Sequence, residues 1–253
     1  MRFFTVEDRR YARFDRLADE VGLVHAFSTR PDDVSAKSDA QAALRRARRS
    51  RFARDLGISA GRIHHCIQIH RPGISLIAHD TRSGPHENVD ALITSAPGEA
   101  LMTFSADCPL LLVYGSSPAV LGVAHASWRC TVAAIARRLV DFMSGALHCA
   151  PSTLRAGIGP SAGPCCYEVK EDVHQAAAGL PARETLFEKR DGRVYFDLWR
   201  ANREQLLAAG LLAENIEIAG ICTMCRTDLF YSFRREGSGC GHFGLMAALC
   251  GQS

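Results

Sequence analysis

Short apolar runs, separated by Gly, Pro, Ser and Asp, fill the first half and the end of the chain. Runs of aliphatic and β-branched residues bounded by turn-forming residues are typical of β-strands. The pattern predicts strands at residues 24–29, 63–69, 91–94, 100–104, 110–114, 120–125, 216–221 and 230–233.

A helical stripe covers residues 131–143, where apolar side chains recur at three- and four-residue steps. An Ala/Arg-rich segment at 39–56 predicts a second helix with Asp39 as its N-cap, and 171–178 and 198–209 predict two more. Strands and helices do not alternate strictly, and the chain has no GxGxxG and no Walker motif. The fold class is therefore α/β in the sense of a mixed α+β sandwich, and we expect a single domain over residues 1–253.

Composition restricts the class of protein. The chain has 253 residues with 47% hydrophobic residues and a formal charge of +3, which is ordinary for a globular protein and does not indicate a nucleic-acid partner. No run approaches the ~20 apolar residues that span a bilayer, so we expect no membrane association. The N-terminus lacks the apolar segment of a signal peptide, which predicts a cytoplasmic protein. The arginines of 39–56 indicate a solvated helix face or, alternatively, a patch that steers phosphate.

Three separated segments carry candidate metal ligands. Gln68 and His70 share one face of a strand end, Cys108 lies in an Asp-Cys-Pro turn, and His125 ends an apolar strand. Two imidazoles and a thiolate suit zinc or copper, and three protein ligands leave a fourth position open. Arg129 follows at the start of the next helix, where unpaired N–H groups and a cation favour an anion. Each residue also has a simpler interpretation: a hydrogen-bonded histidine, a buried thiol and a surface ion pair.

Two other segments contain paired cysteines. Cys165 and Cys166 follow a Gly/Pro-rich stretch, which we interpret as a loop that approaches the substrate closely. A zinc knuckle would need a second cysteine pair, and a redox pair is also conceivable. Cys222 and Cys225 form a C-x-x-C, but its place between two predicted strands disfavours a thioredoxin-like redox role.

Taken together and in order, these motifs resemble the laccase-domain family, also called the polyphenol oxidase family, whose members are mostly described as purine nucleoside phosphorylases. The resemblance runs from about His25 to about His242 and rests on Gln68-x-His70, Val89-Asp90-Ala91-Leu92-Ile93-Thr94, Ala106-Asp107-Cys108-Pro109, His125-Ala126-Ser127-Trp128-Arg129, Gly159-Pro160 through Cys165-Cys166-Tyr167-Glu168-Val169, Cys222-Thr223 and Ser232-Phe233-Arg234-Arg235.

The resemblance implies an α/β/β/α sandwich related to toxin-type cysteine hydrolases. It implies a site at His70, Cys108 and His125 that binds zinc and sometimes copper. The implied activities are phosphorolysis of adenosine, inosine, guanosine and methylthioadenosine, together with adenosine deamination. We predict that Cys108, His70 and His125 are both catalytic and metal-binding, that the partners are a purine nucleoside and phosphate only, and that the protein is a monomer or weak homodimer. Substrate contacts are predicted for Gln68, Arg129, Arg234 and Ser28.

The sequence departs from the family pattern in three places. Ser127 and Cys130 replace two glycines, and we expect their side chains to crowd the helix start. Cys240-Gly241-His242 stands where the family has Thr-Gly-Arg, and the Asn-containing elements expected after Thr29 are missing. Three alternatives follow: a cysteine hydrolase that cleaves an amide of a peptidoglycan precursor, a catalytically degenerate family member and a copper oxidase. The last is disfavoured because the chain contains no His-x-His pair.

Overall fold

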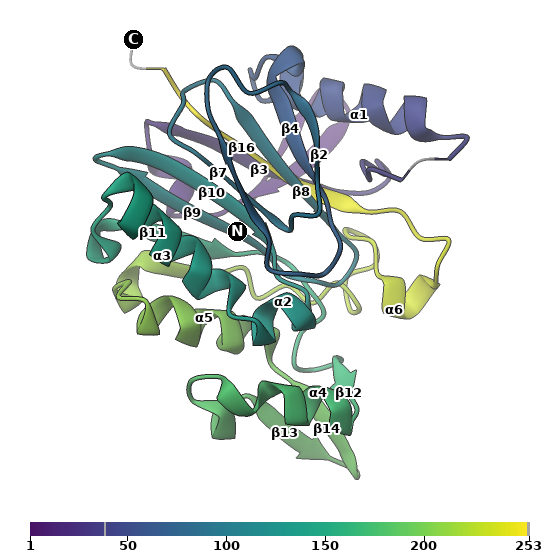
Figure 1. Cartoon of the computed structure of the whole chain (residues 1–253). Helices are drawn as coiled ribbons and strands as arrows, with labels where there is room; N and C mark the ends of the chain where they lie inside the picture. Colours follow the sequence, from purple (N-terminus) through teal and green to yellow (C-terminus); the bar gives the residue numbers. More distant parts are fainter. Residues whose placement is uncertain (38, 252–253) are drawn as a thin grey trace.

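Two stacked β-sheets form the body of the molecule (Figure 1). The computed structural model describes residues 1–37 and 39–251. The larger sheet has the strand order β1 (Arg2–Val6), β2 (Arg9–Arg13), β3 (Leu23–Ser28), β16 (Phe243–Leu249), β8 (Ala100–Ser105), β4 (Ile63–Ile67) and β6 (Gly84–Glu87). The second has the order β15 (Ile216–Ile218), β11 (Arg155–Ile158), β9 (Leu110–Ser116), β10 (Ala119–His125), β7 (Ala91–Thr94) and β5 (Ile74–Ile77).

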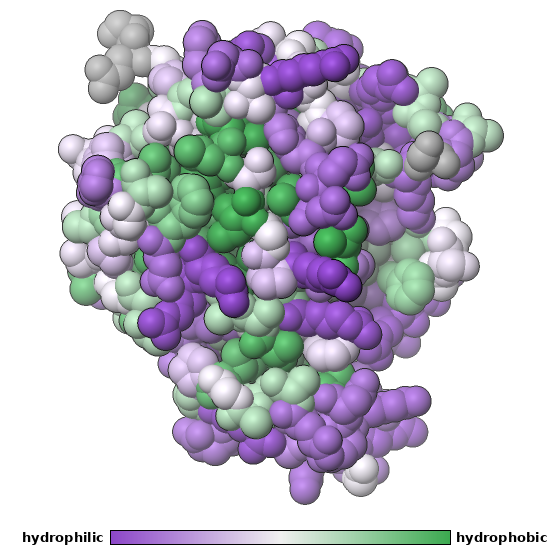
Figure 2. Space-filling view, viewed as in Figure 1, coloured by the Kyte–Doolittle hydropathy of each residue, from purple (hydrophilic) through white to green (hydrophobic). Residues whose placement is uncertain are grey.

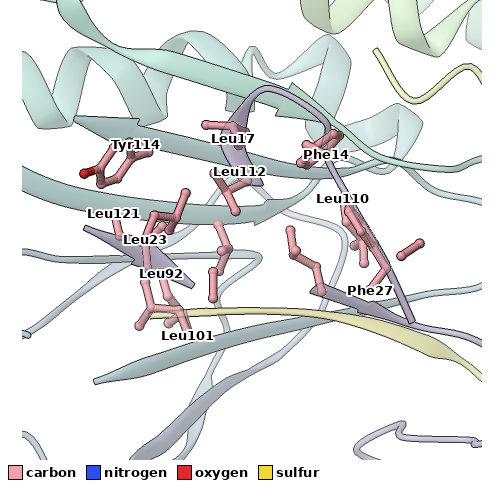
Figure 3. Close-up of a cluster of buried hydrophobic side chains, with 14 of the residues drawn as sticks. Phe14, Leu17, Leu23, Phe27, Leu92, Leu101, Leu110, Leu112, Tyr114 and Leu121 are labelled. Carbon is pink, nitrogen blue, oxygen red and sulfur yellow. The ribbon is translucent and has the colours of Figure 1, made fainter. Parts of the chain in front are cut away.

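The main core lies between these two sheets (Figure 3). Phe27 and Leu101 of the larger sheet and Leu92, Leu112 and Leu121 of the second sheet belong to one buried cluster. Side chains alternate between the two faces of a strand, so the opposite face of each sheet needs its own cover. Both sheets therefore require an outer layer.

Helices supply both outer layers. The helices of the described residues are α1 (Ala42–Asp55), α2 (Trp128–Val132), α3 (Ile135–Leu147), α4 (Glu171–Ala176), α5 (Leu198–Ala208) and α6 (Phe233–Glu236), of which α1, α3 and α5 cover the sheets. Residues of α3 and α5 share a buried cluster with β7, β9 and β10, while Phe52 of α1 stacks on Tyr11 of the larger sheet. The order of layers is helix, sheet, sheet, helix (Figure 1), which is a mixed α+β fold. Kinship with toxin-type cysteine hydrolases, and the assignment of one domain, stay predictions.

A small lobe projects from the body. It consists of α4 and a three-stranded sheet ordered β12 (Glu168–Val169), β14 (Arg193–Phe196) and β13 (Phe187–Arg190), with its own buried cluster around Phe196. The lobe lies at one end of the molecule, and its visible surface is largely hydrophilic (Figure 2). Short 3-10 helices lie at Leu17–Asp19, Ala60–Arg62, Pro151–Thr153, Ala177–Gly179, Arg183–Thr185 and Ala213–Asn215.

The arginines of α1 are less exposed to solvent than the arginines of a simple solvated helix face would be. Arg45 is buried and binds Asp33 at 2.6 Å, and both Arg48 and Arg51 lie within ion-pair distance of Asp32. The helix therefore binds the segment that precedes it. Its first residue is Ala42 with Gln41 at the N-cap, while the Asp39 carboxylate accepts the Gln41 N–H just upstream.

Several predicted elements differ from the observed ones. The stripe at 131–143 is divided between α2 and α3 because Ala134 has the left-handed φ of 60°. The predicted strand at 230–233 is wrong: Ser232 caps α6, its side chain accepting the Arg235 N–H. Pattern analysis also missed β16, the central strand of the larger sheet. None of the helices in the described residues has the length and apolar character to cross a lipid bilayer.

Candidate metal centre

Strands β4, β8 and β10 end at the same edge of the two stacked sheets, and the candidate site lies there. Strand β4 runs parallel to β8, so both end at the same edge of the larger sheet. Strands β7 and β9 run antiparallel to β10, so they begin where β10 ends. The chain crosses between the sheets at this edge, once from β4 to β5 and once from β8 to β9.

His70 and Cys108 lie on these two crossings, and His125 is the last residue of β10. One ligand atom from each lies within 4.8 Å of the other two, and the imidazole rings meet edge to face at 5.0 Å. His125 is buried, Cys108 is half-buried and His70 is exposed. The structure therefore brings the three predicted side chains together, with one side open to solvent.

The backbone is strained on both crossings. His70 has a φ of 59° and Asp107 a φ of 101°, values that non-glycine residues rarely adopt. Hydrogen bonds hold the turn at Asp107 and Cys108. The Ser105 hydroxyl donates to the Cys108 carbonyl at 2.6 Å, and the carbonyl of Asp107 accepts the Ala162 N–H. Such strain concentrates at sites where function fixes the direction of a side chain.

Asp90 orients both histidines through hydrogen bonds. This fully buried carboxylate accepts a 2.8 Å hydrogen bond from His125 Nδ1 and the backbone N–H groups of Ile69, His70 and Arg71. Because Nδ1 of His125 is occupied, its Nε2 is the nitrogen left for the Cys108 side. Carboxylate partners of this kind fix the tautomer of metal-binding histidines.

The electrostatics favour a charged pair at the centre. Burial disfavours the thiolate, but the positive charge of His125 and hydrogen bonds from both histidines lower the pKa of Cys108 to about 7. Burial likewise opposes the imidazolium, but Cys108 and Asp90 raise the pKa of His125 to about 9. A thiolate is thus accessible near neutral pH.

The donor set fits a metal ion. Two imidazoles and one thiolate are ligands for zinc or copper, and the hydrogen bond to Asp90 is the partner that a metal-binding histidine requires. The exposed side of His70 leaves room for a further ligand.

Two of the predicted substrate-binding residues, Gln68 and Ser28, form hydrogen bonds with backbone groups. The Gln68 amide donates to the Phe104 carbonyl at 2.9 Å and accepts its N–H at 2.8 Å. The buried Ser28 hydroxyl accepts the Gly244 N–H at 2.9 Å. Neighbouring His25 accepts the Phe14 N–H and borders a different cavity. The predicted roles of Gln68 and Ser28 in substrate binding stay untested.

The two predicted arginines lie near the surface. The exposed guanidinium of Arg129 stacks over Trp128 at 4.3 Å. Arg234 lies over Tyr167 at 4.8 Å, and its guanidinium donates to the Glu168 carbonyl. Ser127 caps α2 by accepting the Cys130 N–H, and Cys130 packs in the core, so the fold accommodates both side chains that replace glycine.

A cavity of about 240 Å³ opens beside His70. Its wall includes Lys37, Gln68, Phe104 and His242. Within the part of the chain that the structure describes, the buried Nδ1 of His242 has no hydrogen-bond partner.

Sequence reasoning missed the roles of Asp90, Asp107 and His242. The signal for Asp90 was a carboxylate directly before the apolar run at residues 91–93, since a buried charge must have partners. Asp107 accepts the Thr223 hydroxyl at 2.6 Å and the Arg234 N–H at 2.7 Å, linking the Cys108 turn to a distant loop and to the start of α6. No spacing in the sequence indicates those contacts.

Comparison with known proteins identifies the family. The family model described as multi-copper polyphenol oxidoreductase laccase matches residues 25–251. The chain belongs to this family. The resemblance inferred from the motifs is therefore confirmed.

Three relatives with described activities are similar to this chain. Purine nucleoside phosphorylase YlmD of Geobacillus stearothermophilus is 34% identical over 81% of this chain and 77% of its own length. A purine nucleoside phosphorylase of Deinococcus radiodurans is 34% identical over 92% of this chain and 91% of its own. Adenosine deaminase RL5, from an unknown prokaryote, is 33% identical over 64% of this chain and 63% of its own.

A crystal structure of YlmD from Geobacillus stearothermophilus has the same fold. It superposes with a TM-score of 0.86 at 27% identity, covering 98% of this chain and 99% of that one. The likeness includes both sheets and the small lobe, since the alignment covers nearly the whole chain.

Proposed function

We propose that this member of the laccase-like family is a metal-dependent purine nucleoside enzyme. Its reactions would be phosphorolysis of adenosine, inosine, guanosine and methylthioadenosine, with deamination of adenosine alongside. The names of the relatives support the substrate class. The observation that carries the proposal is the meeting of His70, Cys108 and His125 over the buried Asp90.

His70, Cys108 and His125 would hold the metal, with zinc favoured and copper possible as the ion. A bound divalent ion would supply a Lewis acid close to the cavity that His70 lines. Asp90 keeps both imidazoles in place through four hydrogen bonds. A four-copper relay is disfavoured, because this group contains two histidines.

The nucleoside would bind in the cavity beside His70. Phe104 would offer an apolar face there, and Lys37, Gln68 and His242 are the polar residues of the cavity wall. Burial lowers the pKa of His242 to about 4, so the imidazole is neutral at physiological pH. Cavities that combine apolar walls with a few directed polar groups are typical of small-molecule sites.

In phosphorolysis a phosphate oxygen forms a bond to the anomeric carbon while the glycosidic bond breaks. The electron pair of that bond leaves with the base, which takes up a proton, and ribose 1-phosphate is released. We assign phosphate binding to Arg129 and Arg234, whose guanidinium groups form paired hydrogen bonds with such oxygens. Deamination would instead add water to the ring carbon that bears the amine, which leaves as ammonia. Positioning and charge stabilisation would supply most of the rate.

A cysteine hydrolase is the second candidate. The observation in its favour is the pKa of about 7 for Cys108 beside His125, whose pKa is about 9. A thiolate paired with an imidazolium is the arrangement of an activated nucleophile. This enzyme would attack an amide carbonyl through Cys108 and would work without metal.

Base release from adenosine and inosine, with and without phosphate, tests the proposal. We expect release that depends on phosphate and stops after chelation, and a fall of more than about 100-fold in Cys108→Ala, because it removes a ligand and not only a partner of one. Cys250→Ser, at an exposed and isolated thiol, should match wild type. Retained turnover and metal content in Cys108→Ala would contradict the assignment. Amide hydrolysis that survives chelation but not thiol alkylation would favour the cysteine hydrolase.

A further inference from the structure

Four cysteines lie together outside the candidate metal centre. Cys165, Cys166, Cys222 and Cys225 each direct a sulfur to one point, and all four sulfurs lie within 4.8 Å of one another. Cys225 Sγ is 3.8 Å from Cys165 Sγ and 3.4 Å from Cys166 Sγ. In the sequence the two cysteine pairs stand apart, but the fold brings all four cysteines together.

The backbone that carries the cysteines is built for this approach. Ser161 and Cys222 form a parallel bridge, in which the Ser161 N–H donates to the Ile221 carbonyl and the Thr223 N–H to the Ser161 carbonyl. After it, the Cys225 and Arg226 N–H groups both donate to the Cys222 carbonyl. That tight turn places the two sulfurs of C-x-x-C on the same side.

Gly163 brings the other loop close. Its N–H donates to Cys222 Sγ at 3.2 Å, a bond that stabilises negative charge on the sulfur. A Cβ at this position would lie 2.6 Å from the Trp199 ring and 3.2 Å from Cys222 Cβ. Only glycine therefore allows the two cysteine loops to meet at this distance.

The spacing of the sulfurs fits a single tetrahedral ion. With zinc–sulfur bonds of ~2.3 Å, tetrahedral geometry places the sulfurs about 3.8 Å apart. A disulfide has an S–S length of about 2.05 Å, well below the 3.4 Å observed, and would use only two of the four thiols. Four thiolates around one ion is the ligand set of structural zinc sites.

The surroundings also suit a site of negative charge. Zinc with four thiolates carries two negative charges. Arg190 donates to the Pro164 carbonyl at 2.5 Å, and Arg235 donates to the Met224 carbonyl at 3.1 Å. One guanidinium is thus held against each cysteine loop, which lowers the electrostatic cost of that charge.

We propose that Cys165, Cys166, Cys222 and Cys225 hold a structural zinc ion, separate from the candidate metal centre. The ion ties the loop before the small lobe to the loop after β15. Thr223, between the two cysteines of the second pair, donates to the Asp107 carboxylate, and Asp107 precedes Cys108. The second cysteine loop therefore also contacts the turn that carries Cys108.

Metal content per chain tests the proposal in the intact protein. We expect Cys165→Ser/Cys225→Ser to contain one zinc equivalent fewer than wild type, whereas Cys250→Ser keeps the full amount. Cys108→Ala should lose only what the candidate metal centre holds, so the two sites fail independently. An unchanged zinc content in the double variant would overturn the proposal, whatever the enzymatic activity.

Cobalt replacement covers the case in which the double variant does not fold. In cobalt-loaded Cys108→Ala the remaining thiolate ligands are those of the four-cysteine group, so intense thiolate-to-cobalt charge-transfer absorption supports the site. A spectrum without that absorption contradicts it. So does an intact mass lower by two hydrogens under non-reducing conditions, which marks a disulfide, or iron in place of zinc in the protein as purified.

Discussion

A single carboxylate, Asp90, connects the two histidines of the candidate metal centre. It binds His125 through the ring nitrogen and His70 through the backbone N–H groups of its turn. One buried charge therefore fixes a tautomer on one segment and a strained φ on another. The position of the metal ligands depends on a residue that never touches the metal.

Asp90→Asn is expected to weaken metal binding about 10- to 100-fold, the range found for such partners. The amide cannot accept all four hydrogen bonds and directs its NH₂ at one of the donors. Affinity would be measured by competition with a chelator. Asp228→Asn, at an exposed carboxylate paired with Arg226, is the matched control. Equal affinities in the two variants would contradict the role given to Asp90.

A second residue-scale prediction concerns how the free energy of unfolding changes at acidic pH. Burial lowers the pKa of His25 to about 3, against a usual value near 6.5. Between these pH values the unfolded chain binds a proton that the folded chain does not, so the free energy of unfolding falls as pH decreases. This loss amounts to about 1.4 kcal/mol per pH unit for one histidine.

His25→Gln removes this proton while it keeps an acceptor for the Phe14 N–H. Urea unfolding at pH 7, 5.5 and 4.5 should show the variant losing less stability than wild type over this range. His148→Asn changes an exposed histidine whose left-handed conformation asparagine tolerates, and should follow wild type. Parallel curves for His25→Gln and wild type would refute the prediction.

At the scale of elements, the loop after β11 owes its path to glycine. A Cβ on Gly159 would meet the Phe27 ring at 2.6 Å and the Leu110 carbonyl at 2.8 Å. The Gly159 N–H donates to that same carbonyl, and Leu110 pairs with His125 in the sheet. The loop therefore packs against the start of β9, which pairs with the end of β10 at His125.

Gly159→Ala should lower the free energy of unfolding by about 1–3 kcal/mol, because the contact includes backbone that cannot move aside. Gly145→Ala is the counterpart, since nothing lies within 4 Å of its added Cβ in α3. Alanine in a helix interior should raise stability by up to about 1 kcal/mol. Urea midpoints measure both, and equal effects would contradict the packing described.

Pattern analysis at this scale succeeded where one face or both faces of a strand are buried. Strand β7 was predicted at its observed bounds, and β8, β9 and β10 within one or two residues. It failed where long-range contacts decide the outcome. The run 131–143 breaks at Ala134, and α6 forms because its Ser232 N-cap and the Asp107 carboxylate satisfy its first N–H groups.

At the scale of the whole molecule, the candidate metal centre depends on the edge where the chain passes between the sheets. Both sheets end there, so ligands 38 and 17 residues apart meet in space. The three candidate ligands could be named from the sequence because the order of motifs resembles a family. The sequence does not show that these ligands converge or that Asp90 holds them. Nor does it show that the two cysteine pairs meet. These features follow from the fold.

The most direct test of the central claim is anomalous diffraction from crystals of the protein, recorded at the zinc and copper absorption edges. The account predicts an ion bonded to His70, to Cys108 and to His125 Nε2, at ~2.0–2.1 Å from nitrogen and ~2.3 Å from sulfur. Crystals of active protein with no anomalous peak among these three side chains would contradict it.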